Sequence, residues 1–154
     1  MTIDDLISDF NFIATNNLQS SLASYRGQWI ILYFYPKDST PGCTIEGRDF
    51  KAAYEAFKAL NAVIFGVSRD TIKSHENFKT KQEFPFELIS DETETLCTLF
   101  DVIKLKSMYG KKLRGIERST FIINPQGQLK YIGRKVKVIG HVEDILTMLK
   151  ALQE

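Results

Sequence analysis

The chain has 154 residues, of which 44% are apolar, 25% charged and 12% aromatic. This size and composition fit one globular domain over residues 1–154 and exclude a disordered tail protein. A formal net charge of +1 argues against a strongly basic nucleic-acid binder and against an acidic solvating domain. The longest apolar run, Trp29 to Tyr35, is far shorter than the ~20 residues that span a bilayer, so we expect no membrane segment.

The N-terminus carries acidic residues where a secretory signal carries Lys or Arg, and we therefore expect a cytoplasmic protein. The two cysteines, Cys43 and Cys97, are too few and too far apart for a disulfide framework. Combined with the distant His75 and His141, they offer no metal-ligand spacing. We expect no metal ion and no cofactor, and we expect both histidines at exposed helix positions.

The first half of the chain alternates strand and helix patterns. The continuously apolar segment 29–35 predicts a strand that is buried on both faces. Thr40 as N-cap, Pro41 at the first helical position and apolar residues at helical spacing predict a helix over 41–60. A second buried strand is predicted over 62–68. The helical crossover makes the two strands parallel neighbours.

The second half continues the alternation and ends in a hairpin and a helix. We expect helices over 70–81, 91–100 (capped by Asp91) and 141–152, and strands over 86–89, 119–124 and 128–132. The short turn between the last two strands predicts an antiparallel pair, whereas the segments 10–13 and 18–22 are ambiguous. The sum is an α/β fold of the thioredoxin-like type, with a mixed central sheet and helices on both faces.

Cys43 stands at a position that favours a reactive thiol. It lies in the first turn of the predicted helix and seven residues before Phe50, on the face that turns toward the sheet. Unpaired amides and the helix dipole favour an anion there, and open α/β sheets bind ligands at the carboxyl ends of their strands. Position alone leaves a second interpretation open, in which Cys43 is a small buried apolar side chain.

The residues around Cys43 decide between these interpretations. Pro36, Thr40 and Cys43 form the pattern P-x-x-x-T-x-x-C, which resembles the active-site signature of peroxiredoxins of the bacterioferritin comigratory protein (Q-type) subfamily. The resemblance continues through the segments 65–68, 86–92, 108–110 and 115–123 and covers most of the chain from about Phe10. It implies a thioredoxin-like fold, in agreement with the pattern of strands and helices.

The resemblance also implies roles for three residues. Cys43 would attack the peroxide as a thiolate, the Thr40 hydroxyl would donate to a peroxide oxygen, and Arg118 would bind both thiolate and peroxide. Antiparallel pairing of the strands 119–124 and 29–35 would bring Arg118 near Cys43. Without the resemblance, Thr40 is a helix cap and Arg118 a solvated surface group.

Supporting residues are assigned more loosely. Pro36 and Pro41 would shape the loop and shield the thiolate, and Glu46 would orient local donors or complement the helix dipole. Many Q-type members carry a second cysteine five residues after the first, where this chain has Arg48. Cys97 is the remaining candidate for the resolving thiol, but a buried spectator is the favoured interpretation. We therefore expect a one-cysteine cycle in which an outside thiol resolves the sulfenic acid.

Other functions fit less well. A cysteine phosphatase needs C-x5-R, whereas Cys43 and Arg48 form C-x4-R, and a dithiol oxidoreductase needs the C-x-x-C that this chain lacks. The serious alternative is a non-catalytic peroxide sensor or binding module. The Lys-rich segment 104–114 is expected to be a solvated loop and not a nucleic-acid patch. The alternative hypothesis is that it steers an acidic reductant such as a thioredoxin.

By resemblance, the expected partners are small molecules and a thiol donor. Hydrogen peroxide and alkyl hydroperoxides would be the substrates. Thioredoxin, or glutaredoxin with glutathione, would be the reductant. The protein would act as a monomer.

Overall fold

The computed structural model describes residues 1–154, apart from the side chain of Met108. Met108 belongs to the segment 108–110, one of those that resemble the Q-type peroxiredoxins, and its side chain lies outside the described part. The strands of this described part are β1 Asn11–Ala14, β2 Leu18–Ser21, β3 Trp29–Phe34, β4 Ala62–Ser68, β5 Glu87–Ser90, β6 Ile103–Met108, β7 Lys111–Ile116, β8 Ser119–Ile123 and β9 Leu129–Gly133. The helices are α1 Pro41–Ala52, α2 Tyr54–Ala59, α3 Ile72–Gln82, α4 Thr95–Leu99 and α5 His141–Leu152, with a 3-10 helix at Leu22–Tyr25.

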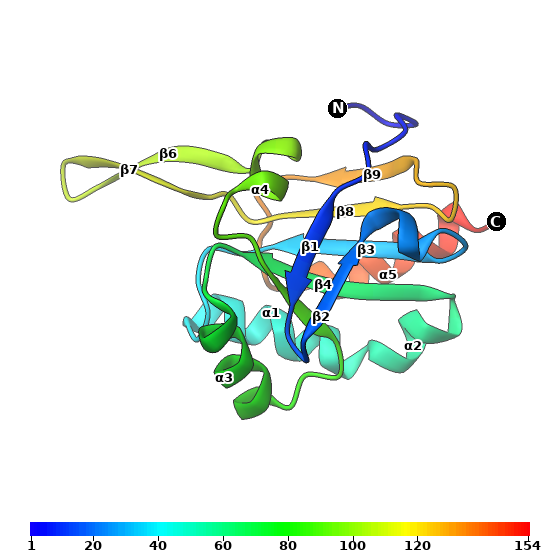
Figure 1. Ribbon diagram of the computed structural model, residues 1–154, viewed down its shortest axis with the longest axis horizontal. Coiled ribbons are helices and arrows are strands. Elements are labelled where there is room, and N and C mark those ends of the chain that lie inside the picture. The colour runs from blue at the N-terminus through cyan, green and yellow to red at the C-terminus, as the bar shows by residue number, and fades with distance from the viewer.

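Seven of the described strands form one mixed sheet in the order β2-β1-β5-β4-β3-β8-β9 (Figure 1). β3 pairs in parallel with β4 and antiparallel with β8, and β4 pairs in parallel with β5. The predicted parallel neighbours and the predicted antiparallel pair of β8 and β9 are both present. The fold is therefore the mixed-sheet, thioredoxin-like arrangement that the sequence predicts.

The central strand β3 divides the interior into two apolar layers, because successive side chains of a strand point to opposite faces. Ile30, Leu32 and Phe34 pack with α4 and the N-terminal segment on one face. Ile31 and Tyr33 pack with α1, α2, α3 and α5 on the other. Burial on both faces explains why β3 is continuously apolar instead of alternating.

The helix predicted over 41–60 is two helices. The backbone leaves the helical region at Ala53, whose φ of −95° and ψ of 3° separate α1 from α2. Phe57, which follows this break, is fully buried in the same layer as Phe50. The sequence pattern missed the break because the two helices bury the same face. The helix predicted over 91–100 is also shorter, since α4 spans Thr95–Leu99.

The segment 104–114 is not the expected loop but part of an antiparallel hairpin, β6–β7, that extends away from the main sheet (Figure 1). Its exposed lysines are solvated as expected, while Arg114 pairs with Glu94 at 2.7 Å. The ambiguous N-terminal segments also form a hairpin, in which β1 pairs with β2. Within the described part of the chain, no helix is long and apolar enough to cross a membrane.

Candidate active site

Cys43 lies in the first turn of α1, directly after the loop that leaves the carboxyl end of β3. Pro41 occupies the start of the helix, where its missing N–H costs no hydrogen bond. The Cys43 side chain is 2% exposed and packs on the same buried face as Phe50. The local sequence thus places a sulfur at a helix N-terminus and at the end of a central strand, where unpaired amides favour an anion.

Arg118 reaches the sulfur from the neighbouring strand. It directly precedes β8, whose first residue, Ser119, pairs with Phe34 at the end of β3. Its Nη2 lies 3.4 Å from Cys43 Sγ, and its Nη1 donates to Glu46 Oε1 at 2.6 Å. Burial acts to lower the pKa of Arg118, but Glu46 and Cys43 outweigh it and raise that pKa above its usual range. The guanidinium therefore stays charged between the sulfur and the carboxylate.

Glu46 lies about one helical turn after Cys43, and its carboxyl group accepts a hydrogen bond from the Arg118 guanidinium. Its side chain is fully buried, and burial raises its pKa to about 7 although Arg118 acts in the opposite direction. Its second oxygen, Oε2, accepts no hydrogen bond from the described residues. His141 Nε2 lies 3.9 Å from this oxygen, too far for a hydrogen bond.

The expectation of exposed histidines is wrong for both residues. His141 is 7% exposed, exchanges a 2.8 Å hydrogen bond with Thr120 Oγ1, and has a pKa that burial lowers to about 4. His75 is fully buried in α3. The signal for both was present, because His75 stands three residues before Phe78 and His141 four residues before Ile145, both buried.

Thr40 occupies the N-cap position of α1, but its hydroxyl makes no capping bond within the described helix. Instead the hydroxyl donates to the Lys37 carbonyl at 2.8 Å, a hydrogen bond within the loop between β3 and α1. Pro36 is half-buried and Pro41 is exposed at the rim of the loop. Arg48, at the position where many of the Q-type proteins that the sequence resembles carry a second cysteine, is exposed on the outer side of α1.

Gly47 is a residue of the site that the sequence pattern did not single out. It is buried in α1 directly after Glu46, and a Cβ at this position would overlap the ring of Phe84. Phe84 stacks on Phe86 and packs edge-on against Phe78. Because Gly47 has no side chain, the Phe84 ring can pack directly against α1 next to Glu46.

Cys97 lies in the opposite apolar layer from Cys43. It is fully buried in α4 among residues that pack on the other face of the sheet. Burial, followed by a hydrogen bond to Asp91, raises the pKa of its thiol well above the usual range. Asp91 also accepts the backbone N–H groups of Leu96 and Cys97 in the first turn of α4, although the N-cap position itself is Glu94 and not Asp91 as predicted. Cys97 is thus a protonated thiol with the sheet between it and Cys43.

A groove on the described surface lies away from Cys43. It has a volume of about 930 Å³ and runs beside β1, β2 and the start of α4, where Phe12 and Leu96 line it. Both of these residues belong to the Cys97 layer. Neither Cys43 nor Arg118 lines this groove, so it is not the site of the thiol chemistry.

The chain matches the model of the AhpC/TSA family over residues 3–132. It is 53% identical to peroxiredoxin Bcp of Xanthomonas campestris pv. campestris, over 93% of this chain and 89% of that protein. It is 50% identical to peroxiredoxin Bcp of Bacillus subtilis, over 86% of this chain and 85% of that protein. A solved structure of the Xanthomonas campestris bacterioferritin comigratory protein, described with its alkyl peroxide reduction activity, superimposes with a TM-score of 0.91 at 51% identity, covering 94% of this chain and 92% of that one.

A thioredoxin-like sheet with a buried cysteine at a helix N-terminus and an arginine beside it defines a thiol peroxidase. The chain belongs to the AhpC/TSA family and, within it, to the bacterioferritin comigratory protein (Q-type) peroxiredoxins.

Proposed function

We propose that the enzyme reduces hydrogen peroxide and small alkyl hydroperoxides with Cys43 as the attacking thiol. The observation that carries this assignment is the 3.4 Å contact between Arg118 Nη2 and Cys43 Sγ, made by a guanidinium that is also tied to Glu46. A fixed positive charge at this point stabilises the thiolate and the negative charge that develops on the peroxide. The activity reported for the Xanthomonas relative supports alkyl peroxides as substrates.

In the first step the Cys43 thiolate attacks the nearer oxygen of R–O–O–H in line with the O–O bond. A sulfur–oxygen bond forms, the oxygen–oxygen bond breaks, and the leaving alkoxide or hydroxide takes up a proton. The sulfur loses two electrons and becomes a sulfenic acid, and the peroxide is reduced to an alcohol or water. Arg118 holds thiolate and peroxide together, so that the attack starts from an aligned pair.

Thr40 and the two prolines form the other wall of the site in this proposal. The Thr40 hydroxyl, which donates to the Lys37 carbonyl, turns toward the peroxide when substrate binds. Pro36 and Pro41 limit the loop's freedom and keep water from the thiolate. Glu46 fixes the direction of the Arg118 guanidinium by accepting from Nη1.

The second half of the cycle uses an outside thiol. The sulfenic acid condenses with a donor thiol to give a mixed disulfide and water, and a second thiol then releases Cys43 in its reduced form. The separation of Cys43 and Cys97 into opposite apolar layers supports this one-cysteine cycle. We propose thioredoxin, or glutaredoxin with glutathione, as the donor, a reducing cytoplasm as the compartment, and a monomer as the acting form.

Steady-state peroxide reduction with thioredoxin, with glutaredoxin plus glutathione and with dithiothreitol tests this proposal. Turnover with at least one donor that is abolished in Cys43→Ser and retained in Cys97→Ala supports it. Turnover that survives Cys43→Ser would contradict the assignment of the attacking thiol.

A further inference from the structure

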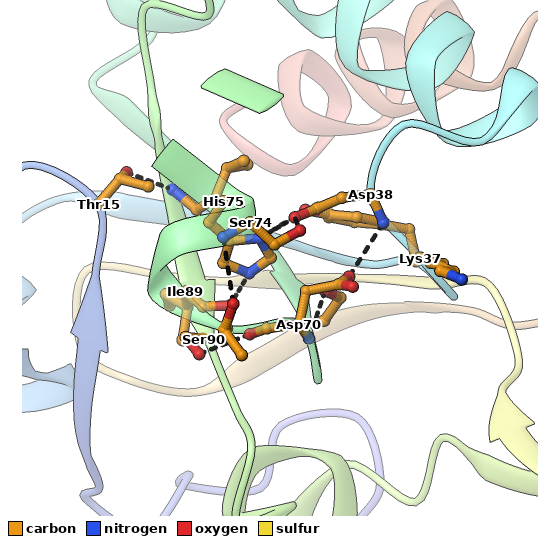
Figure 2. Close-up of polar contacts among 12 residues, drawn as sticks. Thr15, Lys37, Asp38, Asp70, Ser74, His75, Ile89 and Ser90 are labelled. Atoms are coloured by element: carbon orange, nitrogen blue, oxygen red, sulfur yellow. Dashed lines mark hydrogen bonds and ion pairs between the residues drawn. The ribbon is translucent and has the colours of Figure 1, made fainter. Parts of the chain in front are cut away.

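Asp38 is buried in the loop between β3 and α1, five residues before Cys43, and its carboxylate collects three hydrogen bonds (Figure 2). Oδ1 accepts from the Tyr35 hydroxyl at 2.6 Å. Oδ2 accepts from the Ser74 hydroxyl at 2.8 Å and lies 2.7 Å from His75 Nδ1. The donors come from the end of the β3 segment and from α3, so this carboxylate ties the loop to a neighbouring helix.

His75 is doubly engaged in this network. Its Nε2 lies 2.9 Å from the carbonyl oxygen of Ile89, which can only accept, so Nε2 carries a proton. Its Nδ1 faces a carboxylate oxygen, and a proton must therefore lie between Nδ1 and Asp38 Oδ2 as well. The imidazole thus links the loop, through Asp38, to the backbone of β5.

These atoms also raise the question of a metal site. Ligand atoms of Asp38, Asp70 and His75 lie within 4.8 Å of one another. A metal ion needs a free lone pair on the imidazole, whereas both ring nitrogens of His75 face acceptors. The cluster is therefore a hydrogen-bonded anchor.

Asp70 completes the anchor from the end of β4. Its Oδ2 accepts the backbone N–H of Asp38 at 2.9 Å, and its backbone carbonyl accepts the Ser90 hydroxyl at 2.6 Å. The loop is thus joined to the carboxyl ends of β4 and β5 and to α3 (Figure 2).

The backbone immediately after Asp38 needs such support. Ser39 has a φ of 62°, in the left-handed region that a residue with a side chain adopts only at a cost. Thr40 follows, and its carbonyl accepts the Thr44 N–H at 2.9 Å in the first turn of α1. The conformation at Ser39 therefore sets the direction in which α1, and with it Cys43, leaves the loop.

We propose that His75 is a positioning residue for peroxide attack, acting through Asp38 to fix the β3–α1 loop opposite Arg118. This inference rests on the proposed function, because it takes Cys43 as the thiol that attacks the peroxide. His75 does not touch the reacting atoms. Its effect is on the alignment of peroxide with the thiolate, which small displacements reduce strongly.

Two substitutions at one position separate this role from a general loss of stability. In His75→Asn the amide nitrogen stands where Nδ1 stood and keeps a donor to Asp38, while the bond to Ile89 is lost. In His75→Gln the amide nitrogen stands where Nε2 stood and keeps the bond to Ile89, while the bond to Asp38 is lost. Both variants remove the ring and leave comparable space in the core, and thermal unfolding shows whether they are similarly destabilised.

Single-turnover oxidation by hydrogen peroxide and alkylation of Cys43 by iodoacetamide are measured for both variants in a Cys97→Ala background. We expect His75→Gln to lower the peroxide rate by about tenfold or more, His75→Asn to stay within about threefold, and alkylation to change little in either. Equal losses in the two variants, no loss in His75→Gln, or a parallel loss of alkylation would overturn the proposal.

If His75→Gln does not fold, Tyr35→Phe carries the same test, because it removes one hydroxyl donor to Asp38 without changing the core volume. A selective loss of the peroxide rate supports the proposal, and an unchanged rate contradicts it. Failure of the proposed function itself looks different, since it would leave peroxide turnover in Cys43→Ser.

Discussion

Cys43 and Cys97 lie in opposite apolar layers, with the central sheet between them. Disulfide formation requires Cα atoms within ~7 Å, so pairing them would require the sheet or the helices covering it to open. We therefore expect Cys97→Ala to retain peroxide turnover with an outside thiol. Removing a buried sulfur costs on the order of 1 kcal/mol of stability, which denaturant unfolding measures. A loss of turnover in the still-folded variant would assign Cys97 a part in the cycle.

Replacing Arg118 by Lys tests the double contact of the guanidinium. Lysine keeps the positive charge but cannot donate in parallel to Cys43 and to Glu46, as Nη2 and Nη1 do. We expect the peroxide rate constant to fall by roughly 10²-fold, the scale seen when a preorganised donor is removed from a reaction site. Single-turnover kinetics at fixed pH measure this change. A rate within twofold of the natural enzyme would mean that charge alone suffices.

Glu46 and His141 should shape the pH dependence of stability in opposite directions. The folded-state pKa of Glu46 is raised from 4.5 to about 7, so the fold binds this proton more tightly than the unfolded chain does. The resulting stabilisation is present below about pH 4.5 and is lost as the pH rises to about 7. His141 has its pKa lowered from 6.5 to about 4, so its contribution rises with pH across that interval.

The substitution Glu46→Gln separates the two effects. Relative to the natural protein, the free energy of unfolding of Glu46→Gln should rise by about 3 kcal/mol between acidic and neutral pH. His141→Gln should show the opposite trend, with stability that falls more steeply as the pH rises. Urea unfolding over pH 4 to 8 measures both profiles. A Glu46→Gln profile parallel to that of the natural protein would contradict the raised pKa.

Gly47→Ala tests the close contact between α1 and Phe84. Alanine gains up to about 1 kcal/mol of helix propensity over glycine. The new methyl group would nevertheless overlap a ring that Phe78 and Phe86 hold in place. We expect a net loss of about 1–2 kcal/mol in the free energy of unfolding, from overpacking.

Gly115→Ala is the matched control, because a Cβ at Gly115 meets no described atom within 4 Å. Its stability should stay within about 0.5 kcal/mol of the natural protein. Thermal or urea unfolding compares the two alanine variants. Similar changes in the free energy of unfolding of the two variants would show that the Phe84 ring moves to make room for the methyl group.

The β6–β7 hairpin offers a test of how the reductant is guided. Lys111 and Lys112 are exposed on β7 near the turn of the hairpin. If an acidic thioredoxin approaches there, Lys111→Glu with Lys112→Glu should slow its reaction several-fold at low salt, and added salt should shrink the difference. Turnover with dithiothreitol serves as the control and should not change. If the rate constant with thioredoxin changes with neither the substitutions nor the salt concentration, this surface does not guide the reductant.

The sequence predicted the sheet well because its buried strands carry an unambiguous signal. β3 is apolar throughout and β4 is apolar apart from Gly66 and Ser68, and the helical crossover between them predicts their parallel pairing. The antiparallel pairing of β8 with β3 was a condition of the Arg118 assignment that no local pattern supplied, and the structure shows this pairing. The placement of Cys43 close to the carboxyl end of a central strand could therefore be predicted from the pattern of apolar residues alone.

Features that depend on tertiary contacts escaped this reasoning. The break at Ala53 leaves the apolar periodicity intact, and the β6–β7 hairpin is too polar to resemble a buried strand. His75 and His141 were placed on the surface because no carboxylate or cysteine stands near them in the sequence. Their helical spacing to Phe78 and Ile145 indicates burial, but their hydrogen-bond partners, Asp38 and Thr120, are too distant in sequence to give a local signal.

The most direct test is the intact mass of the natural enzyme after one equivalent of hydrogen peroxide, with the modified peptide identified. The proposed chemistry gives one added oxygen atom on Cys43, replaced by a mixed disulfide when a small thiol is supplied, with Cys97 unmodified. A mass lower by two hydrogen atoms, together with a peptide that joins Cys43 to Cys97, would contradict the one-cysteine cycle. Oxidation that leaves Cys43 untouched would contradict the site itself.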